Sequence, residues 1–219
     1  MDDASRLKCL GAIGDVHAEE GLLQAALGHL RARDTERILV VGDIVDGLGD
    51  VEACCRLLDA PDVHTVRGNH ERWFLAREMR DLPDATPLLT LPAATERWLT
   101  SLPVTRRLAT IAGDLLLCHG LGEHDMAGVK PWDEGYALEY NFELHTLQRD
   151  PALQLVVNGH THLRMVRRLG PLVLINAGTL HRRQGPGFLW IDREARRVEM
   201  YDLAPAPPFQ AVLAEVHAF

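Results

Sequence analysis

The chain has 219 residues and a formal net charge of -8 at pH 7, with 47% hydrophobic and 5% aromatic residues. This length is enough to bury one large core, and no linker rich in Pro, Gly or Ser divides it, so we expect a single domain over residues 1–219. The acidic balance argues against general binding to nucleic acids or anionic membranes, because those partners attract surfaces rich in Lys and Arg.

The sequence carries no feature typical of a membrane protein or of an oxidising compartment. Residues 1–10 lack the basic and apolar regions of a signal peptide, and no apolar run approaches the roughly 18 residues needed to cross a bilayer. Cys9, Cys54, Cys55 and Cys118 lack the spacing of a disulfide framework or a zinc site. We therefore expect a soluble, cytoplasmic protein with reduced cysteines.

Strands and helices alternate in the first part of the chain. Apolar runs at 8–15, 37–44 and 62–69 are typical of strands. Segments 18–33, 50–60 and 71–82 repeat apolar residues at helical spacing, with Asp50 as a helix N-cap. This order is typical of a parallel sheet covered by helices.

After Pro103 the pattern changes to short strands separated by turn residues. The expected strands lie at 104–111, 113–120, 153–160, 163–170, 171–178, 187–193 and 196–203. Segment 133–148 is the helix expected in this half, and residues 204–208 predict a loop before a C-terminal tail. A helix-rich half followed by a strand-rich half predicts an α/β fold with two sheets packed together and helices outside.

Five strand-like runs end in polar side chains that suit metal binding. In α/β folds ligands gather beyond the carboxyl ends of strands, so these endings can converge. Each ending alone is typical of a turn or a core residue, but the ordered set indicates a site. The residues are Asp15 and His17, Asp43 and Asp46, Asn69 and His70, His119, and His160 and His162.

The donor types restrict the ions that such a site would hold. Carboxylate, amide and imidazole donors suit Mn, Fe, Zn or Ni, and the lack of nearby thiolates other than Cys118 argues against a structural zinc site. Two ions about 3.5 to 4 Å apart need a shared ligand, which an aspartate supplies with its two oxygens. We expect two divalent ions, with manganese as the first choice.

The ordered motifs resemble those of the calcineurin-like metallophosphoesterases. They are Asp-x-His, Gly-Asp-x-x-Asp-Gly, Gly-Asn-His-Glu, a strand-ending His and Gly-His-Thr-His, and they run from Asp15 to His162. The resemblance implies a four-layer α-β-β-α sandwich of two mixed sheets. It also implies the site residues: Asp15, His17 and His162 for the first metal, Asn69, His119 and His160 for the second, Asp43 as the bridge, and His70 over the substrate phosphate with Asp46 behind it.

The implied activity is hydrolysis of a phosphomonoester or phosphodiester, by in-line attack of a hydroxide held between the two metals. His70 would protonate the leaving group, and a hydrogen bond from Asp46 would orient its imidazole and raise its pKa. The compact length resembles the small prokaryotic-type phosphoesterases, whose substrates vary. We expect a small nucleotide-like ester or another phosphorylated metabolite as the substrate.

Two other functions are weighed against this one. Protein phosphatases and diadenosine-tetraphosphate hydrolases of this superfamily continue the second motif with Asp-Arg-Gly. Here Asp46 is followed by Gly47, which argues against a protein phosphatase. A non-catalytic interaction scaffold of the same fold would lack ligands, and the motifs here are complete.

Two further features leave alternatives open. Arg67 either contacts a phosphate oxygen of the substrate or is a solvated surface group. In segment 121–150, Lys130, Trp132 and Tyr136 either form a lid that stacks on a base or belong to a helix that packs its own aromatic side chains. The second alternative is favoured for this segment.

Overall fold

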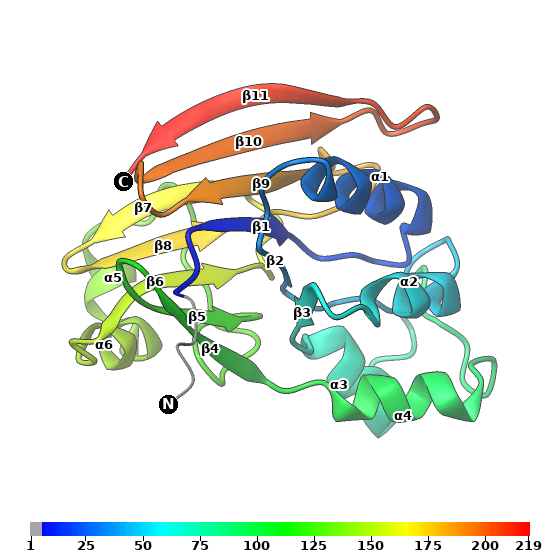
Figure 1. Ribbon diagram of the computed structural model, residues 1–219. Coiled ribbons are helices and arrows are strands. Elements are labelled where there is room, and N and C mark those ends of the chain that lie inside the picture. Colours follow the sequence, from blue (N-terminus) through cyan, green and yellow to red (C-terminus); the bar gives the residue numbers. More distant parts are fainter. Residues whose placement is uncertain (1–5) are drawn as a thin grey trace, which may run out of the picture.

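The computed structural model describes residues 6–219 and contains two β-sheets with helices on their outer faces (Figure 1). The strands are β1 (Cys9–Ile13), β2 (Arg37–Val40), β3 (Val63–Thr65), β4 (Thr105–Thr110), β5 (Gly113–Cys118), β6 (Leu153–Asn158), β7 (Met165–Leu169), β8 (Leu172–Asn176), β9 (Gly187–Asp192), β10 (Arg197–Leu203) and β11 (Ala211–Ala218). The helices are α1 (Glu20–Arg31), α2 (Val51–Leu58), α3 (Asn69–Ala76), α4 (Ala93–Ser101), α5 (Tyr136–Glu139) and α6 (Phe142–Gln148).

Both sheets are mixed. The six-stranded sheet has the order β11-β10-β9-β1-β2-β3, and the five-stranded sheet has the order β4-β5-β6-β8-β7. Strand β1 pairs in parallel with β2, and β2 with β3, through the crossover helices α1 and α2. The predicted alternation of parallel strands and helices in the first part of the chain is confirmed.

Side-chain alternation along the strands creates the layers. In β1, Leu10 and Ala12 face the five-stranded sheet and join the core between the two sheets, whereas Ile13 packs on the other face with Leu27 of α1. A third apolar cluster joins Leu144 of α6 to Val156 of the five-stranded sheet. The order of layers is therefore helix, sheet, sheet, helix, as expected for the four-layer sandwich.

Three local expectations were wrong. Segment 133–148 forms two short helices because the Asn141 side chain accepts a hydrogen bond from the Leu144 N–H (3.0 Å) and starts a new helix, α6. The helix expected at 71–82 begins earlier and ends at Ala76, because Arg77 has a left-handed φ of 61°. The expected C-terminal tail contains strand β11, which pairs antiparallel with β10.

The expected N-cap of α2 is confirmed. The Asp50 side chain caps α2 by accepting a hydrogen bond from the Ala53 N–H at 2.9 Å. The four cysteines are free, and Cys54, Cys55 and Cys118 are buried. No helix within residues 6–219 is both long and apolar enough to cross a membrane.

The carboxyl ends of β1 and β8 join the two sheets at one end of the sandwich. The Asp15 N–H, just beyond β1, donates to the Gly178 carbonyl (3.2 Å), and the Leu180 N–H donates to the Asp15 carbonyl (2.8 Å). The Thr179 hydroxyl also donates to that carbonyl at 3.0 Å. These bonds place the loops that follow strands of both sheets beside one another.

Candidate metal centre

The polar residues that follow the strands adopt an unusual backbone. His17, Asp43, Asp46, His160 and His162 all have positive φ, between 44° and 65°. This left-handed region is costly for residues with a side chain, and such residues gather at functional sites. The loops are therefore held in a strained form that turns these side chains toward one point.

The first group of side chains contains Asp15, His17, Asp43 and His162, whose ligand atoms all lie within 4.8 Å of one another. The His17 Nδ1–H donates to the Asp46 carbonyl at 2.9 Å, and His162 Nδ1 bonds the Gln184 side-chain oxygen. Because carbonyl oxygens only accept, each Nδ1 carries a proton, and each Nε2 is the ring nitrogen that faces the group.

The two Nε2 atoms face each other. The Nε2 atoms of His17 and His162 are 3.2 Å apart, and Asp15 Oδ2 lies 2.9 Å from the latter. Asp15 is fully buried, and its Oδ2 makes no hydrogen bond of good geometry with the described residues. Two imidazole nitrogens and one carboxylate oxygen directed at one place fit a divalent cation.

The second group has the same character. The His119 Nδ1–H donates to the Val41 carbonyl at 2.8 Å, which leaves Nε2 facing the Asn69 side-chain oxygen (2.9 Å) and Asp43 Oδ2 (3.2 Å). His160 Nδ1 lies 3.1 Å from the same Asn69 oxygen. Asp43 belongs to both groups, and it is 2% exposed. A second cation would fit here, with Asp43 between the two positions.

The buried carboxylates of this centre favour a positive charge beside them. Burial opposes a charge on His119, but the carboxylates of Asp43 and Asp15 outweigh it and raise the pKa of His119 to about 10. Burial likewise opposes ionisation of Asp43, but His119 outweighs it and holds the pKa of that carboxyl below its usual range. His17 and His160 are different, because burial lowers the pKa of each imidazole and favours the neutral form that a metal needs.

His70 lies beside the two groups and is held by Asp46. Its Nδ1 is 2.8 Å from Asp46 Oδ2, while its Nε2 faces Asp43 Oδ2 at 3.9 Å, too far for a hydrogen bond. Burial lowers the pKa of His70, but the hydrogen bond to Asp46 and the charge of Asp43 outweigh it, so that the pKa is raised. The imidazole is therefore oriented on one side and free to meet a substrate on the other.

Two residues that the sequence analysis did not single out fix Asp46. The Arg80 guanidinium donates one hydrogen bond to each carboxylate oxygen of Asp46, both at 2.9 Å. The Thr86 N–H donates to Asp46 Oδ1 at 2.8 Å, and the Thr86 hydroxyl accepts from the Asp46 N–H at 2.8 Å. Both residues follow α3 in an irregular stretch, where no sequence pattern points to Asp46.

Glu71 holds the loop that follows β2. Its buried carboxylate accepts hydrogen bonds from the N–H groups of Asp43 (2.9 Å), Ile44 (2.6 Å), Val45 (3.0 Å) and Gly68 (2.8 Å). In the sequence, Glu71 stands only as the end of the Gly-Asn-His-Glu motif. Three of these partners lie 26 to 28 residues away along the chain and offer backbone atoms rather than side chains, so the sequence does not reveal the contact.

At Gly68 and Gly47 neighbouring atoms lie so close to the backbone that a side chain would not fit. A Cβ at Gly68 would lie 2.1 Å from Asp43 Oδ1 and 2.8 Å from His119 Nδ1. A Cβ at Gly47 would lie 1.8 Å from the His17 carbonyl oxygen. The motif position that is Arg in some members of the resembling family therefore has no room for a side chain here.

The structure brings together all nine strand-end residues named in the sequence analysis. Two other expectations concern Arg67 and segment 121–150. The Arg67 N–H donates to the Pro103 carbonyl (2.9 Å), and within residues 6–219 its side chain makes no hydrogen bond or ion pair. The favoured reading of segment 121–150 is supported in part, because Tyr136 of α5 stacks on Tyr140 with ring centroids 5.7 Å apart, although Trp132 and Tyr136 are 65% and 77% exposed. The short helices there are too small to cover them.

Comparison with known proteins agrees with this geometry. The model of the calcineurin-like phosphoesterase superfamily domain matches residues 9–195. No curated protein sequence matches the chain.

Solved structures share the fold at low sequence identity. A hypothetical protein, PH1004, from Pyrococcus horikoshii OT3 has a TM-score of 0.66 at 14% identity, covering 90% of this chain and 88% of that one. The phosphoesterase Yfce from E. coli has a TM-score of 0.56 at 15% identity, covering 96% and 98%. Vacuolar Protein Sorting 29 from Cryptosporidium parvum has a TM-score of 0.56 at 19% identity, covering 97% and 98%. Because the family model spans most of the sequence, the chain belongs to the calcineurin-like phosphoesterase superfamily.

Proposed function

We propose that the protein is a metal-dependent hydrolase of phosphate esters. The observation that carries this proposal is the set of imidazole nitrogens and carboxylate oxygens that face one another in a buried cluster. Asp15, His17 and His162 would hold one divalent ion, Asn69, His119 and His160 a second, and Asp43 would bridge them. Manganese is the first choice, because these borderline oxygen and nitrogen donors suit it.

Two divalent ions would supply charge neutralisation for the phosphoryl oxygens and acidify water at neutral pH. The chain's own residues supply the rest. His70 faces the cluster with its Nε2, so a proton on that atom can pass to the leaving oxygen when the P–O bond breaks. Asp46 holds the imidazole through Nδ1, and Arg80 and Thr86 hold Asp46. Gln184 fixes the ring of His162 in the same way.

The substrate would be a small phosphomonoester or phosphodiester. A protein phosphatase or dinucleotide-polyphosphate hydrolase is a weaker proposal, because Gly47 leaves no space for the phosphate-binding Arg that such relatives carry. An interaction scaffold of the same fold is weaker still, because each of the seven side chains that would hold metal lies in one of the two groups.

Metal analysis and a substrate panel test the proposal together. The protein is dialysed against chelator, reloaded with Mn²⁺ and incubated with p-nitrophenyl phosphate, bis-p-nitrophenyl phosphate and diadenosine tetraphosphate. We expect about two ions per chain and turnover of at least one of the first two compounds, abolished by chelator. Tight binding of two ions without turnover of any ester would favour the scaffold, and absence of metal binding would overturn the centre itself.

A further inference from the structure

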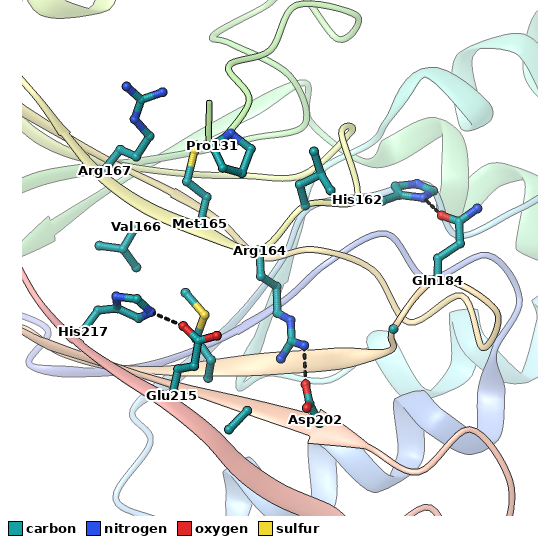
Figure 2. Close-up of a pocket in the computed structure, with 14 residues that line it drawn as sticks. Pro131, His162, Arg164, Met165, Val166, Arg167, Gln184, Asp202, Glu215 and His217 are labelled. Atoms are coloured by element: carbon teal, nitrogen blue, oxygen red, sulfur yellow. Dashed lines mark hydrogen bonds and ion pairs between the residues drawn. The ribbon is translucent and has the colours of Figure 1, made fainter. Parts of the chain in front are cut away.

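A groove begins at the proposed metal centre and runs along the open edge of the sandwich. It has a volume of about 490 Å³ and lies between β7, the edge strand of one sheet, and β10 and β11 at the edge of the other. Figure 2 shows His162 and Gln184 at one end of it and Arg167, Glu215 and His217 at the other. Since His162 belongs to the first metal group as well, this end of the groove borders the centre.

The middle of the groove is apolar. Met165, Val166, Met200 and Ala214 contribute to its lining. The register between β10 and β11 shifts at this point, where Met200 pairs with Glu215 and Tyr201 with Leu213, so that Ala214 is the extra residue of a β-bulge. Bulges occur beside functional sites because they redirect side chains and end regular pairing. Strand β11, which forms one side of the groove, therefore departs from regular strand pairing beside Met200.

The charges that line the groove balance. Arg164 donates to the Tyr201 carbonyl (3.0 Å) and forms an ion pair with Asp202, and Glu215 pairs with His217 at 2.7 Å. Arg167 donates to the carbonyls of Lys130 (2.8 Å) and Asp133 (3.0 Å). With two guanidinium groups and two carboxylates the lining is formally neutral, so it suits a neutral occupant. A second phosphoryl group in this groove would meet the carboxylates of Asp202 and Glu215.

We propose that this groove binds the organic arm of the phosphate ester and that the arm is a neutral nucleoside. The inference rests on the proposed function, because a phosphoryl group at the metal centre is what would direct the arm past His162. A planar base fits between Met and Val side chains, and its polar edge and the ribose hydroxyls would meet Arg164, Gln184 and Glu215. The volume is within the range of small-molecule sites, about 300 to 1,000 Å³.

A matched pair of variants on one strand tests the groove. Ala214→Trp fills it, whereas Val216→Trp adds the same side chain to a residue of β11 that is 53% exposed, does not line the groove and pairs with Glu199. Binding of adenosine 5′-monophosphate and of inorganic phosphate to the manganese-loaded proteins is measured by calorimetry. We expect Ala214→Trp to raise the Kd of the nucleotide by about tenfold or more, the loss of one well-packed aromatic contact. The Kd of phosphate should not change, and Val216→Trp should change neither.

The wild-type protein gives a second measurement that needs no variant. Adenosine 5′-monophosphate should bind more tightly than both ribose 5-phosphate, which lacks the base, and adenosine 3′,5′-bisphosphate, which adds a charge to the arm. Equal affinities for the three ligands, or equal effects of the two Trp variants on the nucleotide, would overturn the groove proposal. An effect of Ala214→Trp on phosphate as large as on the nucleotide would overturn it too, because the change would then act on the metal centre.

Hydrolysis of p-nitrophenyl phosphate separates this inference from the proposed function. Turnover of that small ester together with unchanged nucleotide binding in Ala214→Trp refutes the groove and leaves the phosphoesterase proposal in place. No turnover of any ester, together with nucleotide binding that Ala214→Trp weakens and Val216→Trp does not, supports the groove and refutes catalysis.

Discussion

The Nδ1 atom of His70 lies 2.8 Å from Asp46 Oδ2, and the opposite ring nitrogen faces Asp43 across 3.9 Å. One nitrogen is therefore held and the other is available to a substrate. The four side chains that would hold the first ion do not include His70, so its removal should separate proton transfer from metal binding.

Replacement of His70 by Ala should lower kcat by roughly 10² to 10⁴, the range of general acid-base catalysis, while the metal content stays at its wild-type value. Steady-state kinetics and elemental analysis of the same preparation check this. A variant that loses a full equivalent of metal would show that His70 is a ligand. Replacement of His145, which lies on α6 and bonds the Glu139 carbonyl, is a control that should change neither quantity.

Asp43→Ala should loosen both ions together. The Asp43 carboxylate is 3.2 Å from His119 Nε2 and also belongs to the group with His17 and His162, so its loss removes the one anion that the two positions share. Elemental analysis after dialysis should find less than one ion per chain, whereas His162→Ala should lose chiefly one. Retention of two tightly held ions by Asp43→Ala would contradict a bridging role.

Arg80→Ala should lower kcat by about 10- to 100-fold without loss of metal, because it removes both guanidinium hydrogen bonds that position Asp46 behind His70. KM should change much less, since Arg80 does not face the substrate side of the cluster. Arg80→Lys, which keeps the charge but loses the bidentate geometry, should restore part of the rate. A loss of thermal stability that accompanies the loss in kcat, without rescue by Lys, would indicate a merely structural role.

A pH-dependent stability change is expected outside the proposed metal groups, at Glu199. Burial opposes its ionisation, but hydrogen bonds from Arg33 (2.7 Å) and Tyr201 (2.6 Å) outweigh it and lower its pKa. A carboxyl whose pKa is lower in the folded state adds stability above its unfolded pKa, and this stability is lost as the pH falls through the folded value. Arg33→Gln should therefore cost about 1.5 to 3 kcal/mol of unfolding free energy at pH 7, the loss of a charged hydrogen bond.

Urea unfolding at several pH values measures this cost. The difference between the wild type and Arg33→Gln should shrink as the pH is lowered below 4 and Glu199 takes up a proton in both. The exposed pair Arg31–Asp62 offers a control, because Arg31→Gln should change the unfolding free energy by about 1 kcal/mol or less. A constant difference for Arg33→Gln from pH 7 to pH 3 would contradict the linkage.

The sequence predicted the layers and the strand-end residues because both depend on local patterns. Alternation in β1 sends Leu10 and Ala12 to one face and Ile13 to the other, and the residue that follows each strand necessarily lies at the sheet end. Helix α4 and strand β11 were missed, since α4 has a weak apolar face and β11 is exposed on most of its length.

The supporting residues could not be predicted for a different reason. Arg80, Thr86 and Gln184 contact the centre through loops whose conformation depends on tertiary packing, and no spacing in the sequence connects them with Asp46 or His162. The same is true of the groove, because Met165 and Ala214 come from different sheets.

Each of the two groups takes side chains from both sheets, Asp15 with His162 in one and Asn69 with His119 in the other. An ion bound at either place would therefore fasten one half of the sandwich to the other. Ion binding is then linked to folding, because a free ion concentration a hundredfold above Kd adds about 2.7 kcal/mol to the free energy of unfolding. Scarcity of the ion would weaken the whole fold and not merely stop turnover.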